Sequence, residues 1–175
     1  EKMSEISISK EEFVKAAHLI NAALAIALKK NLDPQYQESF FKKLKSVETL
    51  FLEKTLGVTA QASESNNIKH YRDRLREIRL QISDRLNNGE SPKVLQEEIT
   101  KAFKEILIQI IKESMGMMGG DLPTTFAVMA LGSLARNEAC PYSDLEFAFL
   151  LSKETPEAMN YFRKLSQFPE LRFIN

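Results

Sequence analysis

Apolar residues recur every three or four positions through the first 114 residues, and this spacing constrains the fold more than any other feature. Such spacing places the apolar side chains on one face of an α-helix. It predicts four amphipathic helices, which must bury their apolar faces against one another or against a sheet. In chain order, the four sets are Phe13, Ala16, Ile20, Ala23, Leu24, Ala27 and Leu28; Phe40, Leu44, Val47 and Phe51; Tyr71, Leu75, Ile78, Ile82 and Leu86; and Leu95, Ile99, Phe103, Ile106 and Ile110.

Short polar motifs mark the expected ends of these helices. They combine N-terminal capping residues, proline at a first helical position and glycine after a last one. A run of small polar residues between the second and third helices indicates a loop. The motifs are Ser9 with Glu12 as a capping box, Asp33-Pro34, the loop at residues 59–67, Asn87-Asn88-Gly89, and Ser91-Pro92.

The pattern changes after residue 114. Residues 115–120 (MGMMGG) contain three glycines and no charge, which indicates a flexible joint. Two short apolar runs follow, and their lengths suit buried strands better than helices. We expect an α+β protein in which a helical, bundle-like region (1–114) and the joint precede the first part of a mixed sheet with flanking helices (121–175). The expected elements of this last part are strands at residues 125–131 and 145–151, a helix at 155–166 and a third strand at 170–174.

Composition disfavours several classes of protein. The chain has 24 basic and 24 acidic residues, so it lacks the positive charge that coats nucleic acid or a membrane surface. A single cysteine, Cys140, excludes an internal disulfide and, with two histidines, a zinc site of clustered Cys and His motifs. No apolar run approaches the ~20 residues of a membrane span. We expect a cytoplasmic protein and, because the sequence starts at Glu1 and stops at Asn175 in a strand-like segment, a piece of a longer one.

Residues 132–146 carry the strongest chemical signal. Side chains alternate between the two faces of a strand, so Asp144 and Glu146 are expected on the same face at the start of a strand. Adjacent carboxylates repel unless a cation lies between them, and Mg²⁺ takes one or two carboxylates together with substrate phosphates. The Gly132-Ser133 turn lets backbone N–H groups approach a phosphate, and Arg136 adds a cation. The set predicts a metal–nucleotide site at which an oxygen nucleophile attacks phosphorus.

Each feature also has a plainer interpretation. Asp144 also fits a turn in which the side chain hydrogen-bonds its own backbone. Arg136 and Glu138 are as readily explained by an ion pair that stiffens the turn. Cys140 has no base partner, which indicates a bystander rather than a nucleophile. A row of arginines in the third helix alternates with acids and indicates a solvated face rather than a nucleic-acid patch. These arginines are Arg72, Arg74, Arg76 and Arg79.

One ordered pattern runs through this region, namely Gly132-Ser133, Arg136, Glu138 and then Pro141 to Glu146. This pattern resembles the nucleotidyltransferase superfamily related to DNA polymerase beta. It is most similar to the branch of protein-PII uridylyltransferase and glutamine-synthetase adenylyltransferase, and to the nucleotidyltransferase-like domains grouped with it. That branch commonly has Gly-Gly/Ser-x-x-Arg-x-Glu before Pro-x-Ser-Asp-x-Asp. The resemblance covers roughly residues 124–151, and Glu146 stands where the family usually has Asp.

The resemblance implies transfer of a nucleoside monophosphate from a nucleoside triphosphate to an acceptor, which is a protein in the closest branch. It implies Mg²⁺ or Mn²⁺ as the cofactor, Asp144 and Glu146 as catalytic metal ligands, and Gly132, Ser133 and Arg136 as nucleotide-binding residues. The family's third carboxylate lies on a later strand, and Glu170 is a candidate for it. We expect this segment alone to be inactive, because its metal site is incomplete. The alternative is a helical protein-interaction scaffold with a degenerate, inactive nucleotidyltransferase-like domain. A homodimer is a further expectation.

Overall fold

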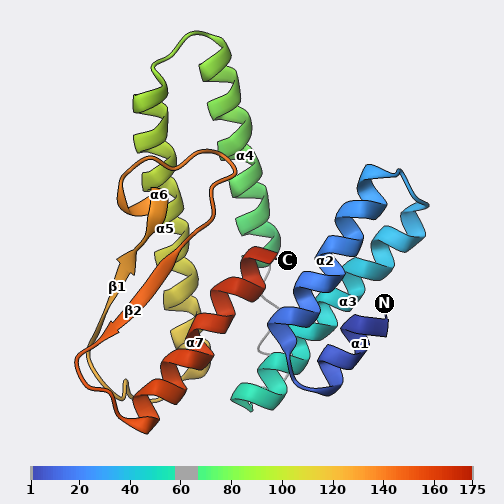
Figure 1. Cartoon of the computed structure of the whole chain (residues 1–175), viewed down its shortest axis with the longest axis vertical. Coiled ribbons are helices and arrows are strands. Elements are labelled where there is room, and N and C mark those ends of the chain that lie inside the picture. The colour runs from blue at the N-terminus through green and yellow to red at the C-terminus, as the bar shows by residue number, and fades with distance from the viewer. Residues whose placement is uncertain (1, 58–66, 175) are drawn as a thin grey trace. The chain divides into compact units, whose positions relative to one another are not determined.

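The computed structural model describes residues 2–57 and 67–174, which are mainly helical with one small antiparallel sheet (Figure 1). The protein is therefore α+β, as the sequence predicts. No helix among these residues has the length and apolar character needed to cross a membrane. The elements are α1 (Lys2–Ser9), α2 (Phe13–Lys29), α3 (Pro34–Phe51), the π-helical turn η1 (Leu52–Leu56), α4 (Asn67–Asn87), α5 (Pro92–Met118), β1 (Phe126–Ala130), α6 (Gly132–Ala135), β2 (Phe147–Leu151) and α7 (Pro156–Ile174).

The chain divides into two compact units. The first contains residues 1–68 and 167–175, and the second contains residues 69–166, so the division falls inside α7. The predicted joint at residues 115–120 lies within the second unit. The assignment of 1–114 and 121–175 to separate domains stays a prediction.

The helices of the first unit pack around aromatic rings. The ring of Phe51, at the end of α3, meets Phe13 and Phe168 edge-on, with centroids 6.0 and 5.1 Å apart. The start of α3 is as predicted, because Oδ1 of Asp33 accepts a hydrogen bond from the Gln35 amide at 2.9 Å and proline occupies the first turn. The sequence thus located this helix correctly from its cap.

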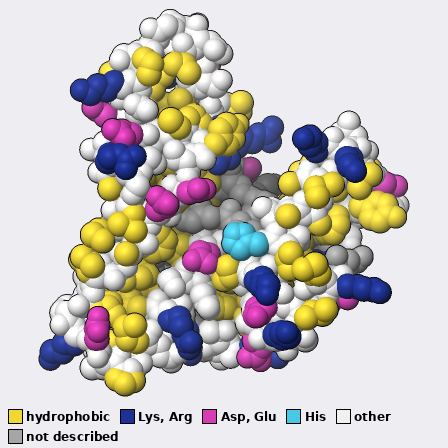
Figure 2. All heavy atoms as spheres, viewed as in Figure 1, with side chains coloured by type: hydrophobic (Ala, Val, Ile, Leu, Met, Phe, Trp, Pro, Cys, Tyr) yellow, Lys and Arg dark blue, Asp and Glu magenta, His cyan; other side chains and the backbone are white. Residues whose placement is uncertain are grey.

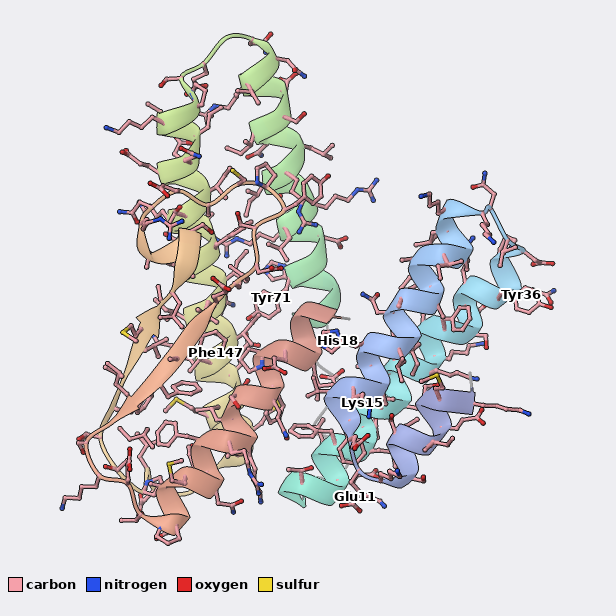
Figure 3. The ribbon with its side chains drawn as sticks, in the orientation of Figure 1. Glu11, Lys15, His18, Tyr36, Tyr71 and Phe147 are labelled. Carbon is pink, nitrogen blue, oxygen red and sulfur yellow. The ribbon has the colours of Figure 1, made fainter. Side chains whose placement is uncertain are left out.

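The beginning of the first unit differs from the prediction. The capping box of Ser9 and Glu12 is wrong, because Ser9 is the last residue of α1 and its hydroxyl donates to the carbonyl of Ile6 at 2.8 Å. The side chain of Glu12 does not cap α2, although Glu12 directly precedes that helix. Glu11, labelled in Figure 3, has a φ of +59° and turns the chain between α1 and α2. The turn is closed by backbone hydrogen bonds, including one from the Glu12 amide to the carbonyl of Ser7 at 2.9 Å.

In the second unit, α4 and α5 form an antiparallel helical hairpin (Figure 1). The turn between them contains Gly89 at a φ of +84°, and both helix ends are as predicted. Arg85 binds the carboxylates of Glu90 and Glu98 across this turn. Hydrogen bonding to Glu90 and then to Glu98 raises the pKa of Arg85, and the same bonds lower the pKa of both glutamates. The predicted loop at residues 59–67 falls almost wholly outside the described residues, and Asn67 already belongs to α4.

Helix α5 is longer than predicted. It continues through Met118, so residues 115–118 of the expected joint are helical. Ile111 and Ser114 are buried at this end, and Ser114 donates to the carbonyl of Ile110 at 2.7 Å. Burial therefore outweighs the low helix propensity of Gly116. The chain leaves the helix at residues 119 and 120, two glycines with positive φ.

The sheet contains β1 and β2, which pair antiparallel with Val128 opposite Phe149. The two predicted strands are thus confirmed. One face packs against α7, where the ring centroid of Phe162 lies 4.9 Å from that of Phe126 and 5.3 Å from that of Phe149. The other face is less covered than the predicted buried strands would be, since half of the Leu150 surface is exposed. Hydrophobic side chains are visible over the β1–β2 sheet in Figure 2.

The predicted third strand at residues 170–174 is wrong, because α7 continues through Pro169 to Ile174. The predicted helix start is confirmed, since the hydroxyl of Thr155 accepts a hydrogen bond from the Ala158 amide at 3.1 Å. The buried positions Phe162, Leu165, Phe168 and Leu171 keep a helical spacing across the proline. Apolar packing of this stripe outweighs the hydrogen bond that proline lacks. Glu170, the candidate third carboxylate, is therefore on a helix and not on a strand.

Candidate functional site

The turn after β1 places Gly132 directly beside Glu146. The amide of Leu131 donates to the carbonyl of Glu146 at 2.9 Å, which continues the β1–β2 pairing by one step. Gly132 has a φ of +53°, and a Cβ at this position would overlap the Glu146 carboxylate. A glycine is required here for both reasons, because it tolerates positive φ and leaves room for the side chain opposite. The predicted site residues Gly132 and Glu146 are thus brought together.

Asp144 and Glu146 lie in the extended segment that leads into β2, not within the strand. The strand begins at Phe147, labelled in Figure 3. Both acidic residues are exposed. Among the described residues, neither carboxylate forms a hydrogen bond or an ion pair, so both are available to a ligand. The described residues, 2–57 and 67–174, contain no cluster of three or more His, Cys, Asp or Glu side chains arranged to bind a metal.

Ser133 and Arg136 belong to the short helical turn α6 and the residue after it. Ser133 is half-buried, and its carbonyl accepts a hydrogen bond from the Glu138 amide at 2.9 Å. The Nε of Arg136 lies 2.7 Å from Oε2 of Glu138, with 62% and 54% of the two side-chain surfaces exposed. The ion pair considered from the sequence therefore exists, although exposed pairs of this kind add little stability. It orients the guanidinium beside the turn, which is compatible with phosphate binding.

Helix α5 anchors the segment that connects α6 to Asp144. The hydroxyl of Thr100, 1% exposed, accepts a hydrogen bond from the buried amide of Ala139 at 3.1 Å and donates to the carbonyl of Gln96 at 2.7 Å. One turn further along α5, Lys104 donates to Oδ1 of Asn137 at 2.8 Å. Asn137 has a φ of +58°, a conformation that asparagine tolerates better than most residues. These contacts tie the loop to a rigid element.

Helix α4 provides a second anchor through Arg79. Its Nε donates to the carbonyl of Pro141 at 2.7 Å, and its guanidinium carbon lies 4.8 Å from the ring centroid of Tyr142. The interpretation of Arg79 as part of a solvated helix face is therefore wrong. A hydrogen bond that joins residues 62 positions apart has no signature in local spacing. Sequence reasoning missed Arg79 and Thr100 for this reason.

Cys140 is an exposed free thiol in the same loop. Its amide donates to the Ser143 hydroxyl at 2.8 Å, and the Ser143 amide donates back to the Cys140 carbonyl at 3.0 Å. Gln96 makes a long contact with its sulfur at 3.8 Å. No histidine or carboxylate side chain among the described residues hydrogen-bonds the thiol. The bystander interpretation fits these contacts, in which Cys140 shapes the turn through its backbone.

Residues 76–170 match the family described as "Putative nucleotidyltransferase DUF294". The chain belongs to this family. The match includes the turn at Gly132, both exposed carboxylates and the parts of α4 and α5 that anchor the loop. A nucleotidyltransferase-like domain implies a nucleotide as substrate. No curated protein and no solved structure gave a significant match to the chain.

Proposed function

We propose that residues 132–146 form the nucleotide- and metal-binding part of a nucleotidyltransferase. The enzyme would move a nucleoside monophosphate from a nucleoside triphosphate to an acceptor, which we propose is a protein. The observation that carries this proposal is the apposition of Gly132 and Glu146, with Asp144 exposed two residues earlier. It places one exposed carboxylate beside a glycine turn and a second two residues earlier in the chain, inside a segment that matches a nucleotidyltransferase family.

The donor chemistry of this site fits Mg²⁺ or Mn²⁺. Mg²⁺ is held by one or two carboxylates and keeps its other positions for water and substrate phosphates. Asp144 and Glu146 would supply the carboxylates, and both are exposed without a protein partner among the described residues. When bound, the metal would neutralise charge on the phosphoryl oxygens.

The remaining groups would bind and orient the triphosphate. The amides of Gly132 and Ser133 lie at the start of α6, where the first N–H groups have no acceptor within the helix. Arg136 adds a guanidinium whose Nε is held by Glu138, and its two terminal nitrogens have no hydrogen-bond partner among the described residues. An acceptor oxygen would then form a bond to the α-phosphorus as the bond to the bridging oxygen breaks, and pyrophosphate would leave.

The protein acceptor, the location and the oligomeric state are also proposals. An exposed thiol at Cys140 suits a reducing compartment, which supports a cytoplasmic location. Exposed apolar side chains of the sheet, Met129 on β1 and Leu150 on β2, support self-association as a homodimer. Light scattering over a range of protein concentrations would test the dimer, and a constant monomer mass would contradict it.

The scaffold hypothesis is the second candidate. It is favoured because the proposed metal site has only two carboxylates. No third metal-ligating side chain joins Asp144 and Glu146 among the residues that the structure describes. In this case the helices would bind a partner protein and the site would bind neither metal nor nucleotide.

Titration calorimetry distinguishes the two. The chain is titrated with ATP and with UTP, each with and without Mg²⁺, and compared with Asp144→Asn. Asp121→Asn is the matched control, because Asp121 is also an exposed acid of the second unit, outside the proposed site. We expect Mg²⁺ to increase nucleotide affinity in the native chain and in Asp121→Asn, and to have at least about tenfold less effect in Asp144→Asn. Absence of Mg²⁺-dependent binding in the native chain would support the scaffold instead.

A further inference from the structure

The segment that carries Asp144 is held mostly by contacts from other elements. Residues 139–146 form a turn and an extended stretch without regular secondary structure. The position of the Asp144 carboxylate therefore depends on what fixes this segment, because an unsupported loop samples many conformations. A metal ligand must be held closely, since Mg²⁺ requires near-ideal geometry.

Different contacts fix different parts of the segment. The Thr100 hydroxyl holds Ala139, at the start. Reciprocal hydrogen bonds between Cys140 and Ser143 then close an internal turn, which sets the shape of the loop but not its position. Among the residues that the structure describes, the helix side chain that hydrogen-bonds residues 141–144 belongs to Arg79.

Arg79 holds two consecutive loop residues by different interactions. It donates from Nε to the Pro141 carbonyl at 2.7 Å, and its guanidinium lies over the Tyr142 ring, 4.8 Å from the centroid. Tyr142 is 82% exposed, so burial does not hold it in place. A planar guanidinium donates and stacks at the same time, which an ammonium group does less well. Asp144 follows two residues after Tyr142, so these interactions fix the part of the segment that directly precedes its carboxylate.

We propose that Arg79 is a positioning residue for metal binding by Asp144. It does not touch nucleotide or metal, and it acts by fixing Pro141 and Tyr142 against α4. The proposal rests on the proposed function, in which Asp144 is a metal ligand. It assigns to α4 a role in the nucleotidyltransferase site that the motif at residues 132–146 does not reveal.

The test separates metal-dependent from metal-independent nucleotide binding. ATP affinity is measured by calorimetry with and without Mg²⁺ for the native chain, Arg79→Ala, Arg79→Lys, Asp144→Asn and the control Arg76→Ala. Arg76 is an exposed arginine of the same helix, so its loss changes the net charge equally. The thermal unfolding midpoint of each variant is recorded in parallel by circular dichroism.

We expect Arg79→Ala to reduce, about tenfold, the factor by which Mg²⁺ increases ATP affinity. Its affinity for metal-free ATP should equal that of Arg76→Ala, because the amides of the Gly132 turn are untouched. Arg79→Lys retains a donor for the Pro141 carbonyl and should recover part of the loss. A merely structural role would instead weaken both kinds of binding together and lower the unfolding midpoint.

The outcomes for the proposed function and for this inference are distinct. If Mg²⁺ has no effect on ATP binding by the native chain, the proposed function fails and the role of Arg79 fails with it. If Asp144→Asn abolishes the Mg²⁺ effect but Arg79→Ala behaves like Arg76→Ala, the proposed function stands and the positioning role is overturned. An equal loss of metal-free and metal-dependent affinity in Arg79→Ala also overturns it.

Discussion

The carboxylate of Glu146 occupies the space beside Gly132 that a Cβ would fill. This relationship links the glycine turn after β1 to the segment that leads into β2. Because the amide of Leu131 also donates to the Glu146 carbonyl, the two segments are joined through both backbone and side chain. The sequence motif and its family resemblance suggested that both residues serve one site, and the structure gives their contact a steric reason.

Replacing Gly132 with alanine should therefore destabilise the second unit in two ways. A non-glycine residue at a φ of +53° costs about 1–2 kcal/mol, and the added methyl group must also displace the Glu146 carboxylate. Urea unfolding measures the total loss in the free energy of unfolding. Repeating Gly132→Ala in an Glu146→Ala background removes the steric part, so the destabilisation should be smaller there by about 0.5 kcal/mol or more. Equal destabilisation in both backgrounds would mean that the contact between the two residues has no energetic consequence.

Two substitutions at Glu146 should distinguish the effect of its charge from the effect of its side-chain length. Glu146→Gln keeps the size of the side chain but removes its charge, so the gain in ATP affinity from Mg²⁺ should fall about tenfold or more. Glu146→Asp keeps the charge and should retain most of that gain, with the free energy of unfolding within about 0.5 kcal/mol of the native chain because the residue is exposed. Calorimetry and urea unfolding provide the two measurements. A Gln variant that keeps the full gain in ATP affinity from Mg²⁺ would exclude Glu146 as a charged ligand.

Thr100 should be important for stability through its hydroxyl. Thr100→Val preserves the shape of the side chain but leaves the buried amide of Ala139 without its acceptor, which costs about 1–3 kcal/mol. Thr100→Ser keeps the hydroxyl and is the matched control, with a smaller loss from the missing methyl group. Urea unfolding of both variants measures the difference. A valine variant as stable as the serine variant would show that the hydrogen bond contributes nothing.

The ion pairs at the α4–α5 turn should make stability depend on pH. Hydrogen bonds from Arg85 lower the pKa of Glu90 and Glu98 below the ordinary value of 4.5. A carboxylate with a lowered folded-state pKa stabilises the fold above its unfolded pKa, and this contribution is lost as the pH falls through the folded pKa. The unfolding midpoint of the native chain should therefore exceed that of Arg85→Met at neutral pH, and the difference should shrink below pH 4.5. The side chains of Glu90 and Glu98 are only partly buried, with 36% and 49% of their surface exposed, so the effect should also weaken in high salt.

The control for this prediction is Arg76→Met, which removes a positive charge from the same helix away from the turn. Its unfolding midpoint should follow that of the native chain across the pH range. A difference between Arg85→Met and the native chain that does not change with pH would show that packing of the arginine, rather than its ion pairs, stabilises the turn.

The sequence by itself determined the helical spacing, the two strands and the order of the site motif. Apolar periods locate helices and strands because side chains project at fixed intervals from each backbone conformation. The cap at Asp33 and the glycine at residue 89 are local features of the same kind. The run from Gly132 to Glu146 also carried the family resemblance, which the match over residues 76–170 supports at the level of a nucleotidyltransferase-like family.

Only the tertiary structure decided the contacts between distant residues. The helical course of residues 170–174 depends on packing of Phe168 and Leu171, which outweighs the local effect of Pro169. The hydrogen bonds of Thr100 and Arg79 to the site loop join residues 39 and 62 positions apart. Local propensity contains no record of such pairs, because they exist only when the chain has folded and brought α4 and α5 against the loop. The candidate ligands were thus readable from the sequence, whereas the elements that hold them in place were not.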